Sequence, residues 1–317
     1  MHQLKQQFLG LVGVQKSGTT WLHGMLVTHP QIHMSPIKEP NYFCDLRDDG
    51  LASTAITDAT LWEYLRQHDG GHSGWIREEA NYQKLLIAPA DKSVVGEASV
   101  SYFCCRNAPR RLAGWCPAAK IIVIVRDPIA RAWSHASMDQ TLGKFSQPVS
   151  VVLGNELREL ETSNLLATRY FRESFYAEAL KRYIALFSRE RVLVLPFADI
   201  KADPKRLLES VGRFLNVRTD LFRDATAANK NVSRPPRWPA LNACIEKIGI
   251  KHFIRKNSPA NLLALGKNTF YKKSIAGIGP DAEFRAAAWP YFQADIDATC
   301  ELVGQDVRAW YSSEHAV

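Results

Sequence analysis

Four apolar runs along the chain predict β-strands that are buried inside the protein. They are Phe8–Val14, Ser93–Glu97, Lys120–Val125 and Arg191–Pro196. Short apolar runs of this kind are typical of parallel strands that are covered on both faces of a sheet. Segments with helical spacing of apolar residues lie between them, and strands that alternate with helices predict an α/β fold with a central parallel sheet flanked by helices.

The predicted helices occupy much of the chain between the strands. Apolar residues after the first strand predict a helix from Thr19 to Thr28, which ends before Pro30. Asp127 and Pro128 suit the start of a second helix, as its N-cap and its first residue. The later helices are expected over residues 128–138, 168–187, 204–215 and 281–303, the last with a kink at Pro290.

The length and composition fit one folded domain. The chain has 317 residues, of which 46% are hydrophobic, and this is enough to bury a substantial core. We expect a single domain whose core covers about residues 8–220. Residues 221–317 are expected to add helices and part of an acceptor site, after an irregular loop over residues 225–239 that is rich in Asn, Lys, Arg and Pro.

Charge and cysteine content narrow the functional classes. The net charge is +8, which fits either a phosphate-rich ligand or a scattered surface excess. The basic residues form no block, so we expect no binding to nucleic acid. The cysteines lack CxxC pairs and zinc-ligand spacing. We expect all six to be buried reduced thiols: Cys44, Cys104, Cys105, Cys116, Cys244 and Cys300.

The apolar segments are too short for membrane insertion or secretion. No stretch approaches the roughly 20 apolar residues of a membrane span. The run Phe8–Val14 is also too short for the core of a signal peptide. Together with reduced cysteines, these features predict a protein of the cytoplasm without a membrane anchor.

A polar loop that contains glycine follows the first predicted strand. It reads Gly13-Val-Gln-Lys-Ser-Gly-Thr-Thr20. Helix N-terminal amides, a glycine that permits close approach and a mobile lysine charge suit a phosphate group. Lys16 precedes Gly18, whereas a Walker A loop carries its lysine after the second glycine, and this difference disfavours an ordinary ATPase or kinase. A tight turn that binds nothing explains this loop equally well.

A second candidate phosphate site follows the strand Lys120–Val125. Arg126 lies at the carboxyl end of this strand, Ser134 lies about two turns into the next helix, and Arg131 lies between them. Arg126 and Ser134 suit a phosphate group, which accepts a charge-assisted hydrogen bond from arginine. A surface turn with a solvent-facing serine is the alternative. A nucleotide with phosphates at two separated positions would need both sites.

These segments resemble motifs of the PAPS-dependent sulfotransferases, where PAPS is 3′-phosphoadenosine-5′-phosphosulfate. Gly13–Leu22 is similar to the 5′-phosphosulfate loop of the family, and Val125–Ser134 is similar to its 3′-phosphate motif. Lys38–Phe43 and Gly96–Tyr102 are similar to segments of heparan-sulfate-type and bacterial members. The chain thus resembles a bacterial-type member of the family, and the resemblance implies a P-loop-like α/β sulfotransferase domain.

The resemblance implies a role for each residue of the two phosphate sites. The family moves a sulfuryl group from PAPS to an acceptor and releases PAP, with no metal ion required. Arg126 and Ser134 would hold the 3′-phosphate, and Lys16 would stabilise the bridging oxygen as its bond to sulfur breaks. The 5′-phosphate would be held by the loop, mainly through the backbone amides of its second half: Gln15, Lys16, Ser17, Gly18, Thr19 and Thr20.

The acceptor hydroxyl needs a base, and several residues suit that role. Cytosolic members of the family use a histidine, whereas heparan-sulfate-type members use a glutamate, which Glu39 matches. Glu39 is therefore the predicted general base, with simple pairing to Lys38 as the alternative. Glu97, His135 and His33 are further candidates. A buried hydrogen-bonding role is the alternative for Glu97, and core packing is the alternative for the histidines.

Departures from the family pattern bear on the acceptor. Ala98 and Val100 replace a lysine and a proline that are usual after the glutamate. That lysine lies beside the acceptor in heparan-sulfate-type enzymes, and its loss argues against a sulfated polysaccharide. Arg234 or Arg237 is expected to complete the phosphate site. Tyr176 is expected either to face the ligands or to pack in the core.

The acceptor is expected to be a small metabolite or a carbohydrate that offers a hydroxyl, in preference to an amine. Aromatic residues in the expected acceptor loops suit such molecules: Trp62, Trp75, Tyr82, Phe145 and Trp238. A small-molecule kinase that uses ATP and magnesium is one alternative, but its Walker A lysine is misplaced here. A non-catalytic binder of nucleotides or polyanions is the other.

Overall fold

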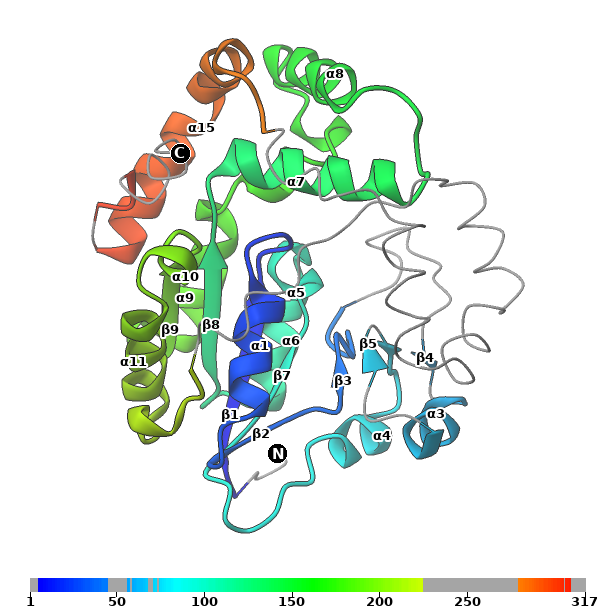
Figure 1. The fold of residues 1–317 in the computed structure, drawn as a ribbon, viewed down its shortest axis with the longest axis vertical. Helices are drawn as coiled ribbons and strands as arrows, with labels where there is room; N and C mark the ends of the chain where they lie inside the picture. Colours follow the sequence, from blue (N-terminus) through cyan, green and yellow to red (C-terminus); the bar gives the residue numbers. More distant parts are fainter. Residues whose placement is uncertain are drawn as a thin grey trace. The chain divides into compact units, whose positions relative to one another are not determined.

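The structure of the protein is a computed structural model (Figure 1). This structure describes residues 5–44, 56–57, 59–67, 71–72, 74–224, 279–304 and 306–308. The loop expected over residues 225–239 lies outside the described residues, and so do Cys244, Arg234, Arg237 and Trp238.

A five-stranded sheet has the strand order β2-β7-β1-β8-β9 (Figure 1). All four pairings are parallel, which confirms the predicted α/β fold. The strands are β1 (Gln7–Gly13), β2 (Ile32–Met34), β7 (Val94–Ala98), β8 (Lys120–Val125) and β9 (Val192–Pro196). The four strands predicted from apolar runs lie within about one residue of their expected bounds, because nearly all of their residues are buried.

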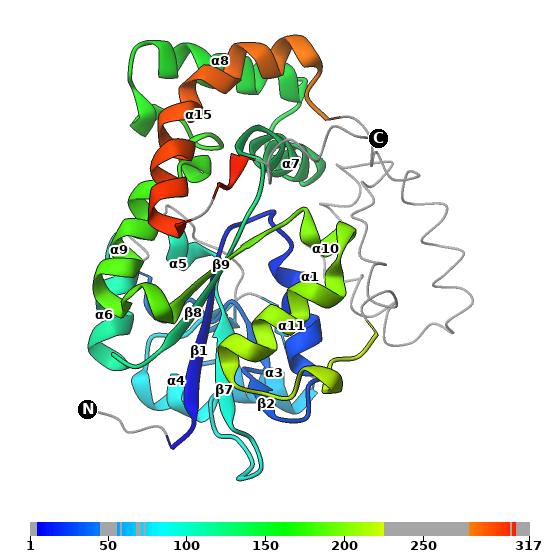
Figure 2. The ribbon, with the colours of Figure 1, turned by 90° about the vertical axis from the view of Figure 1, so that its left-hand side faces the viewer.

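Helices cover both faces of this sheet (Figure 2). One face carries α1 (Thr19–Val27), α10 (Asp199–Ala202) and α11 (Pro204–Leu215). The other face carries α5 (Ser101–Cys104), α6 (Ala108–Trp115) and α9 (Ala177–Phe187). The chain builds β2 and β7 on one side of β1 and then β8 and β9 on the other. The carboxyl end of β1 is therefore the topological switch point, where open α/β sheets bind ligands.

Two short strand pairs and two helices lie along the chain between β2 and β7. β3 (Ile37–Lys38) pairs with β5 (Gly71–His72), and β4 (Ile56–Thr57) pairs with β6 (Gly74–Trp75). The helices are α3 (Leu61–Gln67) and α4 (Glu79–Lys84).

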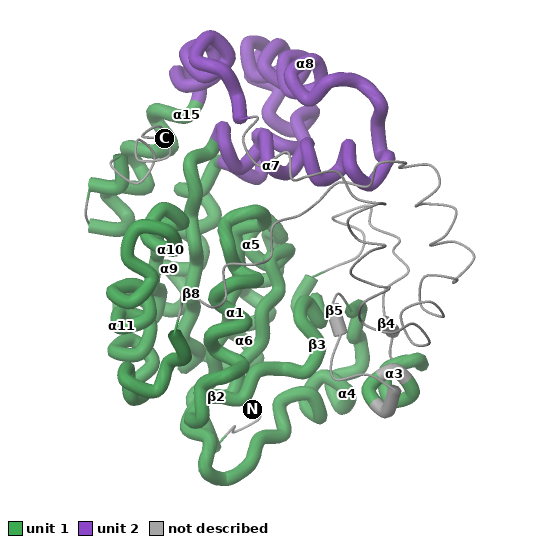
Figure 3. The backbone as a smooth tube through the Cα atoms, in the orientation of Figure 1, with its two compact units in different colours: residues 1–128, 175–228, 292–317 green, residues 129–174, 229–291 purple. Residues whose placement is uncertain are grey.

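The chain divides into two compact units, and each is described by itself (Figure 3). The first comprises residues 1–128, 175–228 and 292–317 and contains the sheet, whereas the second comprises residues 129–174 and 229–291. The remaining elements are α7 (Pro128–Thr141), α8 (Val149–Glu161), η1 (Leu165–Ala167), η2 (Arg172–Ser174), η3 (Arg189–Arg191), η4 (Thr219–Leu221) and α15 (Ala282–Val303). The organisation as a single domain stays a prediction.

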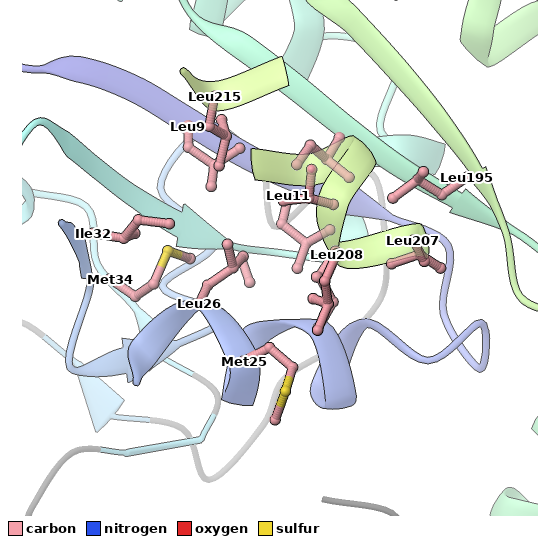
Figure 4. Packing of buried hydrophobic residues seen from close by; sticks show 14 of the residues in the cluster. Leu9, Leu11, Met25, Leu26, Ile32, Met34, Leu195, Leu207, Leu208 and Leu215 are labelled. Atoms are coloured by element: carbon pink, nitrogen blue, oxygen red, sulfur yellow. The ribbon is translucent and has the colours of Figure 1, made fainter. Parts of the chain in front are cut away.

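A cluster of buried apolar side chains joins β1 to α1 and α11 (Figure 4). Leu9 and Leu11 lie two residues apart in β1 and so share one face of the strand. They pack in the same cluster as Leu26 of α1 and Leu208 of α11. Burying a leucine side chain contributes about 1.5–3 kcal/mol, so this cluster fixes α1, and the loop in front of it, against the sheet.

The helix expected over residues 168–187 begins only at Ala177, so its predicted start is wrong. The buried Glu156 carboxylate accepts hydrogen bonds of 2.8–3.0 Å from the amides of residues 169–171. Amides that bind a side chain cannot at the same time form a helical ladder. The apolar spacing therefore extends to residues before Ala177, where the bonds to Glu156 prevent a helix from forming.

Gly18 connects the loop after β1 to α1 in a conformation that a side chain disfavours. Its φ is 86°, and a Cβ there would lie 2.4 Å from Cδ1 of Ile200 and 3.1 Å from Cδ2 of Phe197. Left-handed backbone alone costs an alanine about 1–2 kcal/mol. We expect Gly18→Ala to lower the free energy of unfolding by about 1–3 kcal/mol in urea denaturation.

Gly24→Ala is the matched control, because Gly24 lies within α1 and a Cβ added to it would meet no other side chain within 4 Å among the described residues. Alanine is the better helix former by roughly 0.5–1 kcal/mol, so this variant should be stabilised. Equal effects of the two substitutions would show that the conformation of Gly18 is unimportant.

Candidate functional site

The loop after β1 lies at the carboxyl ends of β1 and β8. The Val14 amide donates to the Ile124 carbonyl of β8 at 2.9 Å. The Arg126 guanidinium donates from Nη1 to the Lys16 carbonyl at 3.1 Å. The predicted phosphate loop and the predicted 3′-phosphate arginine are therefore brought together. Lys16 has a φ of 69°, which costs free energy for a residue with a side chain, and these contacts hold the loop in that conformation.

Several polar groups of the loop fit an anion. Ser17 is fully buried, and its Oγ has no hydrogen-bond partner among the described residues. A buried unsatisfied hydroxyl costs about 1–3 kcal/mol and calls for a partner. The amides of Gly18, Thr19 and Thr20 donate to no backbone carbonyl in the described part of the chain. These amides open α1, where the first amides of a helix lack partners within the helix and attract phosphate groups.

The Ser17 amide differs from the expectation, because it donates to the Val14 carbonyl at 3.1 Å. The amide cradle therefore begins at Gly18, and Ser17 offers its hydroxyl instead. Gln15 and Lys16 are partly exposed, as a side chain that meets a ligand needs to be.

Arg126 is supported on several sides. Its guanidinium lies over the Phe197 ring, 4.4 Å from the centroid. Its carbonyl accepts a hydrogen bond of 2.8 Å from the hydroxyl of Tyr176, which is only 1% exposed. Tyr176 is held in turn by Asp295, whose carboxylate accepts the Tyr176 amide at 2.7 Å. Of its two expected roles, Tyr176 therefore has the packing one, with its hydroxyl on the backbone of Arg126.

Asp295 belongs to α15, far along the chain, and caps α9. It accepts the Tyr176 and Ala177 amides at 2.7 and 3.0 Å. Burial raises the pKa of Asp295 to about 6, although these two hydrogen bonds act in the opposite direction. The C-terminal helix thus supports Arg126 indirectly, through the start of α9.

Ser134 lies in the part of α7 that belongs to the second unit, and it is partly exposed. The joint action of Ser134 and Arg126 on one phosphate stays a prediction. Arg131 is fully buried, and donates from Nε to Ser174 Oγ at 2.7 Å and from Nη1 to Glu173 at 3.3 Å. Arg131 thus holds η2 within the second unit.

The two histidine candidates are placed differently. His135 is buried, with Nδ1 3.3 Å from Oε2 of Glu173. Burial raises the pKa of Glu173, but the His135 hydrogen bond and the Arg131 charge outweigh it and lower that pKa below its usual value. His135 is thus buried against Glu173 inside the second unit, as its packing alternative implied. His33 lies on β2 and is partly exposed.

Glu39 lies directly after β3, in a turn against the end of β7. Its amide donates to the Ala98 carbonyl at 2.7 Å, and its carbonyl accepts the Gly74 amide at 2.7 Å. Its Oε1 lies 2.6 Å from Nζ of Lys38, and the Glu39 side chain remains 18% exposed. The carboxylate is therefore fixed by an ion pair and yet open on one side, which suits a base that must meet an acceptor.

Glu97 lies on β7 beneath this turn and is 1% exposed. Its carboxylate accepts hydrogen bonds from Ser99 Oγ at 2.6 Å and from Tyr82 Oη at 3.1 Å. Burial raises the pKa of Glu97 to about 7, the hydrogen bonds from Ser99, Tyr102 and Tyr82 lower it, and the charge of Glu39 adds to the rise. The structure thus gives Glu97 the buried hydrogen-bonding role.

The aromatic residues expected near the acceptor are not alike. Tyr82 is fully buried on Glu97 and stacks with Tyr42 at a centroid distance of 4.2 Å, so it belongs to the core. Trp75 is 8% exposed, whereas Trp62 is 37% exposed and donates to Asn81. Phe145 is partly exposed in the second unit. Among the described aromatic residues, the full burial of Tyr82 contradicts its expected contact with an acceptor.

The cysteines described by the structure form no disulfide bond with one another. Cys44 and Cys105 are buried, but Cys104 is exposed and Cys116 and Cys300 are partly exposed, so the prediction of burial is wrong at these three residues. Cys104 ends α5, a short helix with buried and exposed sides, and adjacent residues of a helix point in different directions.

Two searches concern only the described part of the chain. None of its helices combines the length and the apolar character needed to cross a membrane. No group of three or more His, Cys, Asp or Glu side chains in that part is arranged to hold a metal ion.

Comparison with known proteins places the chain in a group of enzymes. A model described as "Sulfotransferase family" matches residues 9–221. The chain is 27% identical over 218 residues to the bifunctional heparan sulfate N-deacetylase/N-sulfotransferase 4 of Mus musculus, and this match covers 65% of the chain and 22% of that protein. It is 27% identical over 210 residues to the heparan sulfate glucosamine 3-O-sulfotransferase 3B1 of Homo sapiens, covering 66% of the chain and 45% of that protein.

A solved structure has the same fold. The sulfotransferase from Alicyclobacillus acidocaldarius aligns with a TM-score of 0.66 and 23% identity, over 97% of this chain and 99% of that one. The chain spans less than half the length of the two curated relatives.

The buried Glu97 carboxyl predicts a pH dependence of stability. Its pKa is about 7 in the folded protein, against 4.5 ordinarily, so the folded state binds the proton more tightly. Stability from this group is complete below about pH 4.5 and falls as the pH rises to about 7, by up to roughly 3 kcal/mol. The side chain of the Glu97→Gln variant cannot titrate. The free energy of unfolding of the variant should therefore rise relative to that of the wild type between about pH 4.5 and 7.

Urea denaturation of both proteins between pH 4.5 and 8 measures this difference. The gain of the variant should level off above pH 7, where Glu97 is ionised in both states. Parallel stability curves for wild type and variant would mean that Glu97 titrates as it does in water.

Proposed function

The chain belongs to the sulfotransferase family, and on this premise we propose that it transfers a sulfuryl group from PAPS to an acceptor hydroxyl and releases PAP. The observation that carries the proposal is the hydrogen bond between Arg126 and the Lys16 carbonyl. It joins the loop suited to a 5′-phosphate with the arginine suited to a 3′-phosphate, and PAPS carries both groups.

The loop would bind the donor through its amides and its lysine. The amides of Gly18, Thr19 and Thr20 and the Ser17 hydroxyl would hold the 5′-phosphate. Lys16 would face the oxygen that bridges phosphorus and sulfur, because a mobile ammonium group can follow charge as it develops there. Gln15 would lie at the mouth of the same loop.

The 3′-phosphate would be held by Arg126 and Ser134. The ring of Phe197 and the hydroxyl of Tyr176 hold Arg126 before the ligand arrives. A preorganised guanidinium loses less side-chain entropy on binding than a free one. Ser134 would add a hydroxyl donor from α7.

The transfer itself is a substitution at sulfur. The acceptor oxygen forms a bond to sulfur while the bond from sulfur to the bridging oxygen breaks, and the electron pair leaves on the 5′-phosphate of PAP. We propose that Glu39 takes the proton of the acceptor hydroxyl and that Lys16 stabilises the leaving charge. The reaction needs positioning and charge stabilisation, and these are what the residues of the site supply.

The acceptor we propose is a small metabolite or a carbohydrate with a free hydroxyl. The names of the curated relatives support a carbohydrate, since one acts on glucosamine of heparan sulfate. Ala98 stands in place of the lysine that lies beside the acceptor in heparan-sulfate-type members, and this difference argues against a sulfated polysaccharide. A screen with labelled PAPS against simple sugars, phenols, alcohols and amines would identify the class.

Binding of PAP tests the donor site. We expect PAP to bind with micromolar or tighter affinity in calorimetry without magnesium. Ser134→Ala should weaken PAP binding roughly tenfold, the value of one hydrogen bond to a charged group, and should leave binding of 5′-AMP unchanged.

Ser137→Ala is the matched control, because Ser137 lies one turn further along α7 and is partly exposed. It should bind both nucleotides like the wild type. Absence of PAP binding would refute the proposed donor, and equal losses for PAP and 5′-AMP in Ser134→Ala would refute the placement of the 3′-phosphate.

Kinetics with an acceptor from the screen test the catalytic roles. Lys16→Ala should abolish transfer, because the leaving charge loses its cation. Glu39→Gln should lower kcat by about 10²–10⁴-fold, the usual range for a general base, with little change in the KM for PAPS. Arg110→Ala, an exposed residue of α6, is the control. If Glu39→Gln turns over at the wild-type rate, another residue is the base.

A further inference from the structure

The turn that carries Glu39 has a left-handed backbone at two residues. Glu39 and Asn41 have φ values of 64° and 52°. This conformation costs a glutamate about 1–2 kcal/mol, whereas an asparagine adopts it more readily. One hydrogen bond lies within the turn, from Nδ2 of Asn41 to the Glu39 carbonyl at 2.8 Å, and contacts from outside the turn add to it.

On one side Gly74 of β6 holds the turn, where its carbonyl accepts a hydrogen bond from Nδ2 of Asn41 at 3.0 Å. On the other side the amides of residues 39, 41 and 43 make three contacts with the end of β7 and the residues after it. The Glu39 amide donates to the Ala98 carbonyl at 2.7 Å. The Asn41 amide donates to Ser99 Oγ at 3.1 Å. The Phe43 amide donates to the hydroxyl of Tyr102 at 3.2 Å. The first contact is made by the main chain, whereas the next two depend on side-chain hydroxyls.

The hydroxyl of Ser99 can receive the Asn41 amide only if its own hydrogen points elsewhere. That hydrogen goes to Oε2 of Glu97, at 2.6 Å. A hydroxyl has one hydrogen and two lone pairs, and an ionised carboxylate only accepts. Glu97 thus fixes the direction of the Ser99 hydroxyl and presents a lone pair to the Asn41 amide.

Glu97 is at the same time remote from any acceptor. It is 1% exposed and enclosed by the Tyr82 hydroxyl of α4 at 3.1 Å and by Tyr102 of α5, which also donates to it. Burying a carboxylate in this way is costly unless hydrogen bonds compensate. Its position below the turn accounts for its presence better than contact with substrate does.

We propose that Glu97 and Ser99 are positioning residues for sulfuryl transfer, which hold the turn of residues 39–41 so that the Glu39 carboxylate stays in place for the acceptor. The chain of contacts runs from Glu97 to the Ser99 hydroxyl, to the Asn41 amide and so to Glu39. This inference rests on the proposed role of Glu39 as the base.

Ser99→Ala removes the hydrogen bonds that connect Glu97 to the Asn41 amide. The substitution leaves the other contacts of Glu97 and of the turn in place. We expect kcat to fall roughly 10–100-fold, the effect of a small displacement of a catalytic group, with the KM for PAPS and the affinity for PAP unchanged. Hydrogen exchange of the Asn41 amide should become faster. Glu97→Gln, which keeps the shape of the side chain but loses the acceptor-only carboxylate, should slow kcat in the same direction.

Ser93→Ala is the matched control, since Ser93 is exposed before the other end of β7 and its hydroxyl donates to the Gln31 carbonyl. It should match the wild type in kcat and in exchange of the Asn41 amide. Wild-type kcat in Ser99→Ala, or an equal loss in Ser93→Ala, would overturn the inference.

A double-mutant cycle separates this inference from the proposed function. If Ser99 acts through Glu39, Glu39→Gln with Ser99→Ala should be no slower than Glu39→Gln alone. Losses that multiply would show that Ser99 acts independently, and the positioning role would be refuted while Glu39 remained the base. Wild-type kcat in Glu39→Gln alone would instead refute the base, and the positioning role with it.

Discussion

The parallel pairing of β1 with both β7 and β8 is the constraint on which the candidate site depends. Leu11 pairs with Ala98 of β7, and Gly13 pairs with Val123 of β8. The three strands therefore end beside one another, and whatever follows each of them meets at one edge of the sheet. The phosphate loop, the anchor of the Glu39 turn and Arg126 are the segments that follow. Their proximity is a consequence of strand register and not of separate interactions.

Buried carboxylates fix irregular segments within each of the two compact units. Glu156 accepts the amides of residues 169–171, Asp295 accepts those at the start of α9, and Glu97 accepts hydroxyls below the Glu39 turn. Loops cannot satisfy their own polar groups as helices do. A buried carboxylate accepts several donors at once, and therefore it can hold a loop in one conformation at the cost of its own desolvation.

The sheet and the place of the loop after β1 could be predicted from the sequence, because both follow from local patterns. Apolar runs identify strands that are buried on both faces, and the position of Lys16 before Gly18 is visible in the sequence itself. The predicted start of α9 is wrong, because Glu156 of another helix binds the amides of the residues that were expected to begin it. Such an effect depends on tertiary contacts, and apolar spacing does not reveal it.

The same distinction explains what could be foreseen about the site. The residues Glu39 and Glu97 were both visible as candidates, but their environments were not. Tyr82 is a further example. Its sequence context suits contact with an acceptor, but in the structure its hydroxyl donates to the buried carboxylate of Glu97. The sequence does not indicate a role for Asn41 or Ser99. Their hydrogen bond depends on the left-handed backbone of the turn, which apolar spacing does not reveal.

The two glutamates at this edge differ in their exposure to solvent, and the roles proposed for them follow from that difference. Glu39 is partly exposed and bound to one cation, whereas Glu97 is enclosed by hydroxyl donors and titrates near neutrality. A base must exchange its proton with an acceptor, which requires an open side, and a positioning group must keep its hydrogen bonds, which requires a closed one. Burial is the main cause of the raised pKa of Glu97, and the charge of Glu39 adds to it.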